Sequence, residues 1–98
     1  MKFNNWSKKR IKEGKKTLTS RRKMGDFGHD KDISNIVGPL PWWFIKTYLY
    51  RAEGAESPEE LQRVINQIFR RHVELNEGFY VHVLTDYCLD RIKRGDGD

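Results

Sequence analysis

The spacing of apolar and polar residues predicts an alternation of short helices and strands, with no internal repeat. Residues 5–13 have helical spacing, Asn4 or Asn5 can serve as the N-cap, and Gly14 is expected to end the helix. Residues 17–21 alternate in polarity and are rich in β-branched side chains. We therefore expect the first strand there.

The first strand is expected to have two chemically different faces, because side chains of a strand alternate in direction. One face carries two hydroxyl groups and a cation, from Thr17, Thr19 and Arg21. The other face carries a cation, an apolar residue and a hydroxyl group, from Lys16, Leu18 and Ser20. Leu18 is expected to point into the core.

The middle of the chain combines a turn-rich segment with an aromatic helix. Residues 24–32 contain two glycines and three aspartates, which predicts a mobile surface loop. A short strand is predicted over residues 33–37 and is closed by residues 38–41. A helix is predicted over residues 41–53, ending at Gly54. Its apolar residues lie nearly all round the axis, which indicates burial on several sides.

The last third of the chain predicts a capped helix followed by a long strand. Ser57 fits the N-cap, Pro58 the first helical position, and Glu60 completes the capping box. The apolar stripe that would pack this helix on a sheet consists of Leu61, Val64, Ile65, Ile68 and Phe69. The longest strand-like run is residues 79–89, and residues 90–98 form a charged end that we expect to fray.

Length and composition indicate a single domain. A chain of 98 residues has room for one modest core, which we assign to residues 1–90, with residues 91–98 as a flexible charged tail. Cys88 is the single cysteine, so no intramolecular disulfide can form and a reducing, cytoplasmic setting is expected. No apolar run is long enough to cross a bilayer, so no membrane partner is expected. The oligomeric state stays open.

The charge is distributed very unevenly along the chain. Residues 1–23 contain ten Lys or Arg residues and one acid, whereas the remainder contains nine cations and thirteen acids. The net charge of +5 therefore combines a strongly basic N-terminal part with a mildly acidic body. Such an asymmetry points to a polyanionic partner such as RNA or DNA. A solvated basic surface with no partner is the more common outcome for a charge run.

Few residues offer metal or catalytic chemistry. His29, His72 and His82 have no ligand spacing among them, so neither a metal site nor a cofactor is expected. No serine lies in a nucleophile elbow, and no glycine-rich loop can cradle a phosphate. These absences argue against common hydrolase and nucleotide-binding motifs.

Lys16, Thr19 and Glu53 are the remaining candidates for nucleophilic or acid–base chemistry. A threonine hydroxyl needs a neighbouring base or cation, and Lys16 is the nearest candidate. Glu53 precedes Gly54 at a helix end, where it could orient the lysine or transfer protons. The residue pattern alone favours ordinary roles, as a strand threonine, a solvated lysine and a surface acid.

Two tandem tryptophans offer a stacking surface. If one of Trp42 and Trp43 faces the core, the other points roughly a third of a turn away. That second ring could line a cleft, where an aromatic wall beside a basic strand would stack an unpaired base. We expect at least one of the two rings in the core.

Two segments resemble the signature motifs of ASCH domains. Residues 14–21 fit Gly-x-Lys-x-x-Thr-x-Arg, the first motif of that family. Residues 53–61 look like its second motif, Glu-Gly-x-x-Ser-x-x-Glu-Leu. Residues 80–84 stand where the family has a closing strand. The resemblance covers most of the chain outside the loop and the tail.

The resemblance implies an α+β fold built on a small β-barrel of the PUA-like superfold, in abbreviated form, with two main helices packed on it. Family members are associated with RNA binding, some are similar to ribonucleases, and one branch hydrolyses the amide of N4-acetylcytidine. The lysine, threonine and glutamate of that branch match Lys16, Thr19 and Glu53. Arg21 matches the arginine of the first motif, which implies a phosphate or substrate contact.

The basic segment and the resemblance together predict binding of RNA or a modified nucleoside in a basic cleft. The expected binding residues combine cations, a hydroxyl group and an aromatic ring, namely Lys15, Lys16, Thr19, Arg21, Arg22 and Trp43. An N4-acetylcytidine amidohydrolase is the alternative, and a ribonuclease is a further one. A protein-interaction module with exposed aromatic residues is the remaining possibility.

Overall fold

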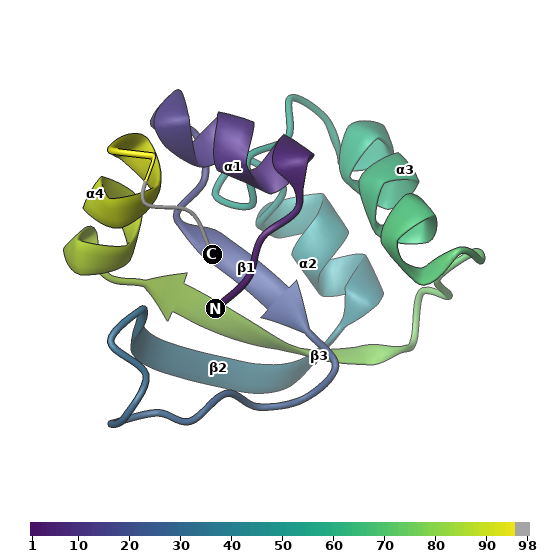
Figure 1. Cartoon of the computed structure of the whole chain (residues 1–98). Coiled ribbons are helices and arrows are strands. Elements are labelled where there is room, and N and C mark those ends of the chain that lie inside the picture. The colour runs from purple at the N-terminus through teal and green to yellow at the C-terminus, as the bar shows by residue number, and fades with distance from the viewer. Residues whose placement is uncertain (96–98) are drawn as a thin grey trace.

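The three strands form one antiparallel sheet in which β3 lies between β1 and β2. The structure is a computed structural model that describes residues 1–95, where four helices accompany this sheet (Figure 1). In chain order the elements are α1 (Asn5–Lys12), β1 (Leu18–Arg21), β2 (Ile33–Pro41), α2 (Trp42–Tyr48), α3 (Pro58–Phe69), β3 (Gly78–Leu84) and α4 (Asp86–Lys93). The predicted α+β class is confirmed, and the sheet is open rather than closed into a barrel.

The helices α1, α2 and α3 lie together on one side of the sheet, and α4 packs beside α1 (Figure 1). Residues 1–4 cross in front of β1 before α1 begins (Figure 1). The Asn4 side chain accepts a hydrogen bond from the Ser7 backbone N–H at 2.8 Å, which confirms Asn4 as the N-cap of α1. No helix within residues 1–95 has the length and apolar character needed to cross a membrane.

The main hydrophobic core joins α2 and α3 to the sheet. Its buried members are Trp42, Ile45, Ala55, Leu61, Ile65, Val73, Phe79 and Val81. Trp42 is fully buried, and its indole N–H donates to the side-chain oxygen of Gln62 at 2.7 Å. The ring of Phe79 packs against Trp42 with 5.4 Å between ring centroids. Leu18 packs against this core, as the alternation of the first strand predicted.

Helix α3 begins where its capping sequence predicts. The Ser57 hydroxyl accepts a hydrogen bond from the Glu60 backbone N–H at 3.1 Å, and Pro58 is the first helical residue. Leu61 is buried, but Ile68 on the same apolar stripe is 51% exposed. The stripe is therefore wider than the part that the core covers.

Strand β2 is longer than the sequence predicts. We expected it to close after residue 37, but it continues to Pro41, because its pairing with β3 shifts between Val37 and Leu40 and then resumes. Gly38 permits this irregularity, since it has a φ of 134°. A Cβ atom at Gly38 would also lie 2.9 Å from the carbonyl oxygen of Phe79.

The aromatic helix α2 is shorter than the predicted helix over residues 41–53. It ends at Tyr48, and the chain then turns towards Gly54. The Glu53 N–H donates to the Leu49 carbonyl at 3.0 Å, and further main-chain hydrogen bonds between residues 50 and 55 close the turn. This turn directs Glu53 towards the segment that precedes β1.

The predicted strand over residues 79–89 is wrong at its C-terminal end. Strand β3 stops at Leu84, and the Thr85 hydroxyl then accepts a hydrogen bond from the Cys88 N–H at 3.1 Å as the N-cap of α4. Cys88 and Ile92 are buried together at helical spacing. Residues 91–93, which we assigned to the tail, belong to α4, and residues 96–98 of that prediction lie outside the described residues.

His82 lies at the centre of β3 and ties the loop before β2 to the sheet. Its Nε2 accepts a hydrogen bond from the Gly25 N–H at 2.9 Å, and its Nδ1 lies 3.0 Å from the Tyr80 carbonyl oxygen. These partners fit the neutral ring with its proton on Nδ1. Burial lowers the pKa of His82 and outweighs the backbone hydrogen bonds, which act in the opposite direction.

We expect the protein to lose stability when the pH falls below about 6.5, the ordinary pKa of histidine. Because the pKa of His82 is lowered in the fold, the unfolded chain takes up a proton first, and the stabilisation is complete only above that pH. The free energy of unfolding in urea should fall by up to about 1.4 kcal/mol per pH unit. His82→Gln should give a flatter dependence between about pH 7 and pH 5. An equal slope in both proteins would contradict the role of His82.

Candidate functional site

The segment before β1 is joined to the turn after α2 by main-chain contacts. Lys16 and Glu53 face each other in an isolated antiparallel bridge. The N–H groups of Thr17 and Leu18 both donate to the Ala52 carbonyl, at 2.8 Å and 3.0 Å. The backbone therefore brings together two segments that are more than thirty residues apart.

Lys16 and Glu53 form a buried ion pair at this junction. The Lys16 ammonium lies 3.3 Å from Glu53 Oε1 and donates to the Glu53 carbonyl oxygen at 3.0 Å. Only 3% and 4% of their side-chain surfaces are exposed. Burial lowers the pKa of Lys16, and the negative charge of Glu53 acts in the opposite direction. The hydroxyl of Ser20 donates to the second carboxylate oxygen of Glu53.

Gly54 allows the two segments to approach so closely. Its φ of 103° lies in the left-handed region that favours glycine. A Cβ atom at this position would lie 2.9 Å from the Cβ of Arg10 and 3.0 Å from the Cβ of Lys16. A side chain here would therefore push the turn away from α1 and from the segment that carries Lys16.

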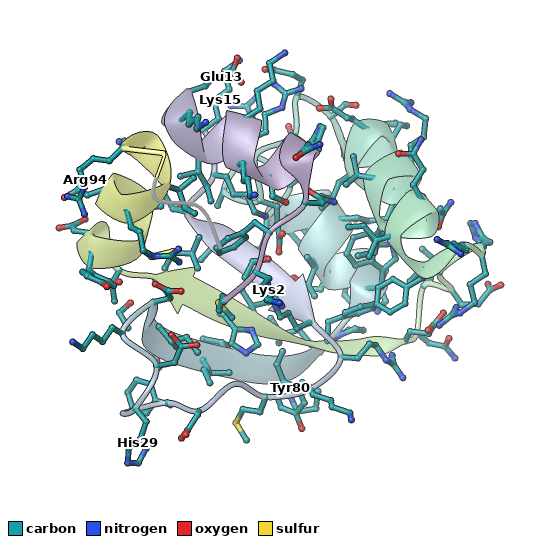
Figure 2. The ribbon with its side chains drawn as sticks, viewed as in Figure 1. Lys2, Glu13, Lys15, His29, Tyr80 and Arg94 are labelled. Atoms are coloured by element: carbon teal, nitrogen blue, oxygen red, sulfur yellow. The ribbon has the colours of Figure 1, made fainter. Side chains whose placement is uncertain are left out.

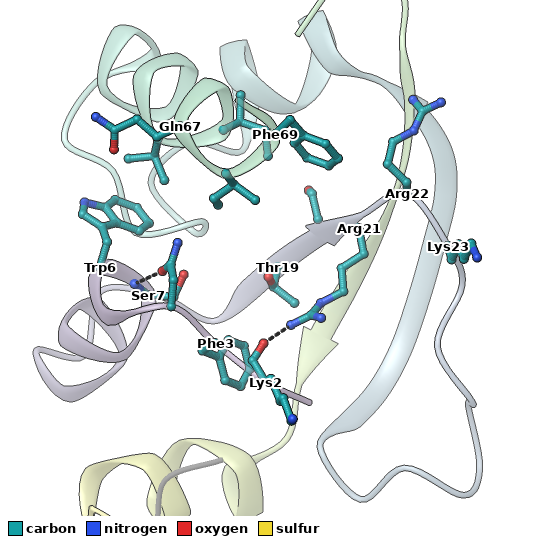
Figure 3. A pocket seen from close by; sticks show the side chains of 15 residues that line it. Lys2, Phe3, Trp6, Ser7, Thr19, Arg21, Arg22, Lys23, Gln67 and Phe69 are labelled. Atoms are coloured by element: carbon teal, nitrogen blue, oxygen red, sulfur yellow. Dashed lines mark hydrogen bonds between the residues drawn. The ribbon is translucent and has the colours of Figure 1, made fainter. Parts of the chain in front are cut away.

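A pocket of about 730 Å³ opens beside the ion pair, between α1, α3, β1 and residues 1–4 (Figure 3). Its cationic lining residues are Lys2, Arg21, Arg22 and Lys23. Its apolar wall consists of Phe3, Trp6, Val64, Ile65, Ile68 and Phe69. No acidic residue within residues 1–95 is among those that line it. Ser20 also lines the pocket, so it connects this space to Glu53 behind the wall.

The two arginines at the pocket are held in place by backbone carbonyl groups. The guanidinium of Arg21 donates to the Lys2 carbonyl (Figure 3) and lies 5.6 Å from the centre of the Phe3 ring. Arg22 donates to the Gly78 carbonyl at 2.9 Å and lies over the ring of Phe79. Both charges are therefore positioned before any ligand arrives.

Trp6 provides the large aromatic surface of the pocket. It projects from α1 on the side of the pocket that faces α3 (Figure 3). The Arg10 guanidinium lies 5.3 Å and the Lys16 ammonium 5.9 Å from the centre of its ring. These cation–π contacts join the indole ring to the buried ion pair.

Several of the predicted site residues come together in the structure. Lys16 and Glu53 form the ion pair, and Thr19, Arg21 and Arg22 line the pocket. Lys16 and Glu53 are not themselves among the described residues that line the pocket, and Ser20 connects the pair to this space. The predicted site residues therefore fall into two neighbouring groups, a buried ion pair and part of a pocket wall.

Besides Lys16, two predicted binding residues do not line the pocket within the described chain. Lys15 pairs with Glu56 at 3.0 Å. It lies beside Glu13 at the end of α1, away from the pocket residue Lys2, which lies over the sheet (Figure 2). Trp43 is 46% exposed on α2, where it packs edge-on against Phe44, and it does not line the pocket within the described chain. The tandem position of Trp43 could not show which way α2 turns relative to β1.

The hydroxyl beside the ion pair belongs to Ser20, a residue that the family motif does not contain. Thr19 pairs with His82 across the sheet and points to the opposite face of β1 from Ser20. The alternation of the first strand had already placed Ser20 on the same face as Lys16. Trp6 gave no comparable signal, because a single tryptophan on a basic helix also fits a weak core contact.

Comparisons with known proteins do not assign a family, since no family model, no curated protein and no solved structure matches this chain. The resemblance to ASCH domains therefore remains a prediction from the two motifs. Within residues 1–95, no three His, Cys, Asp or Glu side chains lie close enough together to hold a metal ion.

We expect the Lys16–Glu53 pair to behave as one energetic unit. Lys16→Met should lower the free energy of unfolding by about 3–5 kcal/mol, because it leaves a buried carboxylate without its counter-ion. The double variant Lys16→Met/Glu53→Gln contains neither charge and should lose less stability than the two single losses added together. Urea denaturation of the wild type, Lys16→Met, Glu53→Gln and the double variant measures this coupling.

The matched control is Lys15→Met, which removes an exposed neighbouring ammonium and should change stability little. Strictly additive losses in the cycle would show that Lys16 and Glu53 do not stabilise each other.

Proposed function

We propose that this protein binds RNA or a modified nucleoside in the pocket between α1, α3 and β1. The observation that carries the proposal is the composition of the wall, which combines four cations and three aromatic rings with no acid within the described residues. Cations bind phosphate groups, and aromatic rings stack on unpaired bases. The pocket volume of about 730 Å³ falls within the range of small-molecule sites.

The geometry suggests a division of labour inside the pocket. The ring of Trp6 offers a flat surface for a base, with the apolar side of α3 opposite. Arg21 ends β1 and Arg22 follows it, and both line the pocket, where they would meet the phosphate groups of the same ligand. A nucleotide presents these two features together, a flat ring and a nearby anion.

Kinship with ASCH domains is part of this proposal. The two motifs meet at the ion pair, because Lys16 belongs to the first motif and Glu53 to the second. In our interpretation the open sheet is an abbreviated form of the PUA-like barrel, and α1 and α3 supply the walls of the binding pocket. An RNA or nucleoside partner and a cytoplasmic setting belong to the same proposal.

Amide hydrolysis of an acylated cytidine is the second candidate function. The buried Lys16–Glu53 pair favours it, because a carboxylate and an ammonium beside a hydroxyl-lined pocket can transfer protons. Release of acetate from N4-acetylcytidine is the reaction to measure. A ribonuclease stays a prediction without a supporting observation, since no histidine is among the described residues that line the pocket.

Binding of short single-stranded RNA should weaken as salt increases, because phosphate contacts release counterions. Arg21→Ala and Arg22→Ala should each weaken binding and reduce the slope of log K against log salt by about one. Fluorescence anisotropy of a labelled oligonucleotide measures both quantities. Lys15→Ala removes an equal charge outside the pocket and serves as the matched control. An affinity that does not respond to salt or to the arginine variants would refute the proposal.

The two tryptophans test which surface binds the base. Trp6→Leu should weaken binding of RNA by roughly tenfold to a hundredfold, the usual effect of losing one stacked base. Trp43→Leu, on the exposed side of α2, should leave the affinity close to that of the wild type. Circular dichroism should confirm that both variants are folded. A larger effect of Trp43→Leu would move the binding surface to α2 and contradict the pocket.

A further inference from the structure

Ser20 places a hydroxyl group between the pocket and the buried ion pair. Its Oγ donates to Glu53 Oε2, while Glu53 Oε1 faces the Lys16 ammonium at 3.3 Å. Ser20 is half-buried and lines the pocket, so its hydroxyl adjoins the space that a ligand would fill. A serine, a carboxylate and a lysine therefore follow one another from the pocket wall into the interior.

The neighbouring hydroxyl has different surroundings. Thr19 also lines the pocket, but it lies on the other face of β1, opposite His82 in the sheet. Within residues 1–95, the side-chain groups that donate to the Glu53 carboxylate are those of Lys16 and Ser20. A proton leaving Ser20 would thus have an acceptor already in contact.

We propose that Ser20 is the nucleophile of an acyl-transfer reaction in this pocket, with Glu53 as its base. The proposal rests on the hydrolytic candidate function above and assigns its reacting atom. The substrate class is an acyl group carried by the exocyclic nitrogen of a flat ring that stacks on Trp6. Lys16 is the positioning residue, since its ammonium lies 3.3 Å from Glu53 Oε1 and holds the carboxylate in place.

The reaction balances within these groups and one water molecule. Ser20 Oγ forms a bond to the acyl carbon as its proton passes to Glu53 Oε2. The carbon–nitrogen bond then breaks, and the leaving amine takes the proton from Glu53. Water next attacks the acyl-serine ester and gives a proton to Glu53, which returns it to Ser20 as the carboxylic acid departs. Nothing is oxidised or reduced.

The environment of the ion pair suits such a step. The pair is almost fully buried, so its charges act in a low dielectric, where electrostatic stabilisation is stronger than in water. The apolar wall from α3 limits the water around the acyl group. The Lys16 ammonium also lies near the ring of Trp6, which keeps the stacking surface next to the reacting hydroxyl.

A fluorophosphonate probe tests the nucleophile without assuming any substrate. The intact wild-type chain should gain one phosphonyl group, and mass spectrometry should place it on Ser20. Trypsin releases residues 17–21 as one peptide, so fragment ions can distinguish Ser20 from Thr17 and Thr19. Ser20→Ala should not be labelled. Ser34→Ala, which removes a serine on the exposed strand β2, should be labelled like the wild type.

The outcomes separate this proposal from the proposed function. A wild-type protein that is not labelled, or is labelled on a threonine, overturns the role of Ser20 even if it binds N4-acetylcytidine. Labelling of Ser20 without binding of that nucleoside supports the nucleophile and refutes the substrate. If acetate is released, Ser20→Ala should slow its release by roughly a thousandfold or more. Because labelling is located in the wild-type chain, poor folding of a variant would not obscure the result.

Discussion

The buried contact between Lys16 and Glu53 joins the segment before β1 to the turn after α2, next to the candidate site. Each of these charges would be costly in the interior by itself, so the position of one side chain requires that of the other. The main chain supports the same junction, because two N–H groups at the start of β1 share the Ala52 carbonyl. The end of α1, the start of β1 and the turn after α2 therefore meet at one point, and Ser20 links this point to the pocket.

The pocket exists because the apolar stripe of α3 is wider than the core that receives it. Leu61 and Ile65 are buried, while Ile68 is half exposed and faces the space between α1 and β1. Acidic side chains near this region have basic partners: Glu60 binds Arg10 at 2.9 Å, and Glu77 binds Arg71 and also lies 3.6 Å from the Arg22 guanidinium. The wall is consequently apolar on one side and cationic on the other, a combination that suits an anionic ligand with a flat ring.

Local sequence signals predicted those parts of the fold that local interactions determine. The cap of α3 and the alternation of β1 are examples, and the alternation placed Ser20 on the same face as Lys16, where both meet Glu53. The extension of β2 to Pro41 depends on pairing with a distant strand, so its own sequence could not reveal it.

The candidate site was harder to predict because its walls come from distant segments. Periodicity indicated that one ring of the tandem tryptophans is buried, and Trp42 confirms this. It could not indicate whether Trp43 or Trp6 faces the basic strand, since that depends on how the helices lie on the sheet. The motif resemblance pointed to Lys16 and Glu53, but it contained no information on Ser20, whose contact with Glu53 appears only in the folded structure.

The cations of the basic segment have structural partners as well as a place in the pocket wall. Arg21 and Arg22 donate to main-chain carbonyl groups and lie over aromatic rings, so folding has already restricted their motion. Binding of a ligand to these two arginines therefore costs less side-chain conformational entropy than binding to side chains that must first be ordered. Lys16 extends this coupling to the interior, because one ammonium group neutralises Glu53 and lies 5.9 Å from the ring of Trp6. A change in the charge of the buried pair would therefore also alter the surface on which a base would stack.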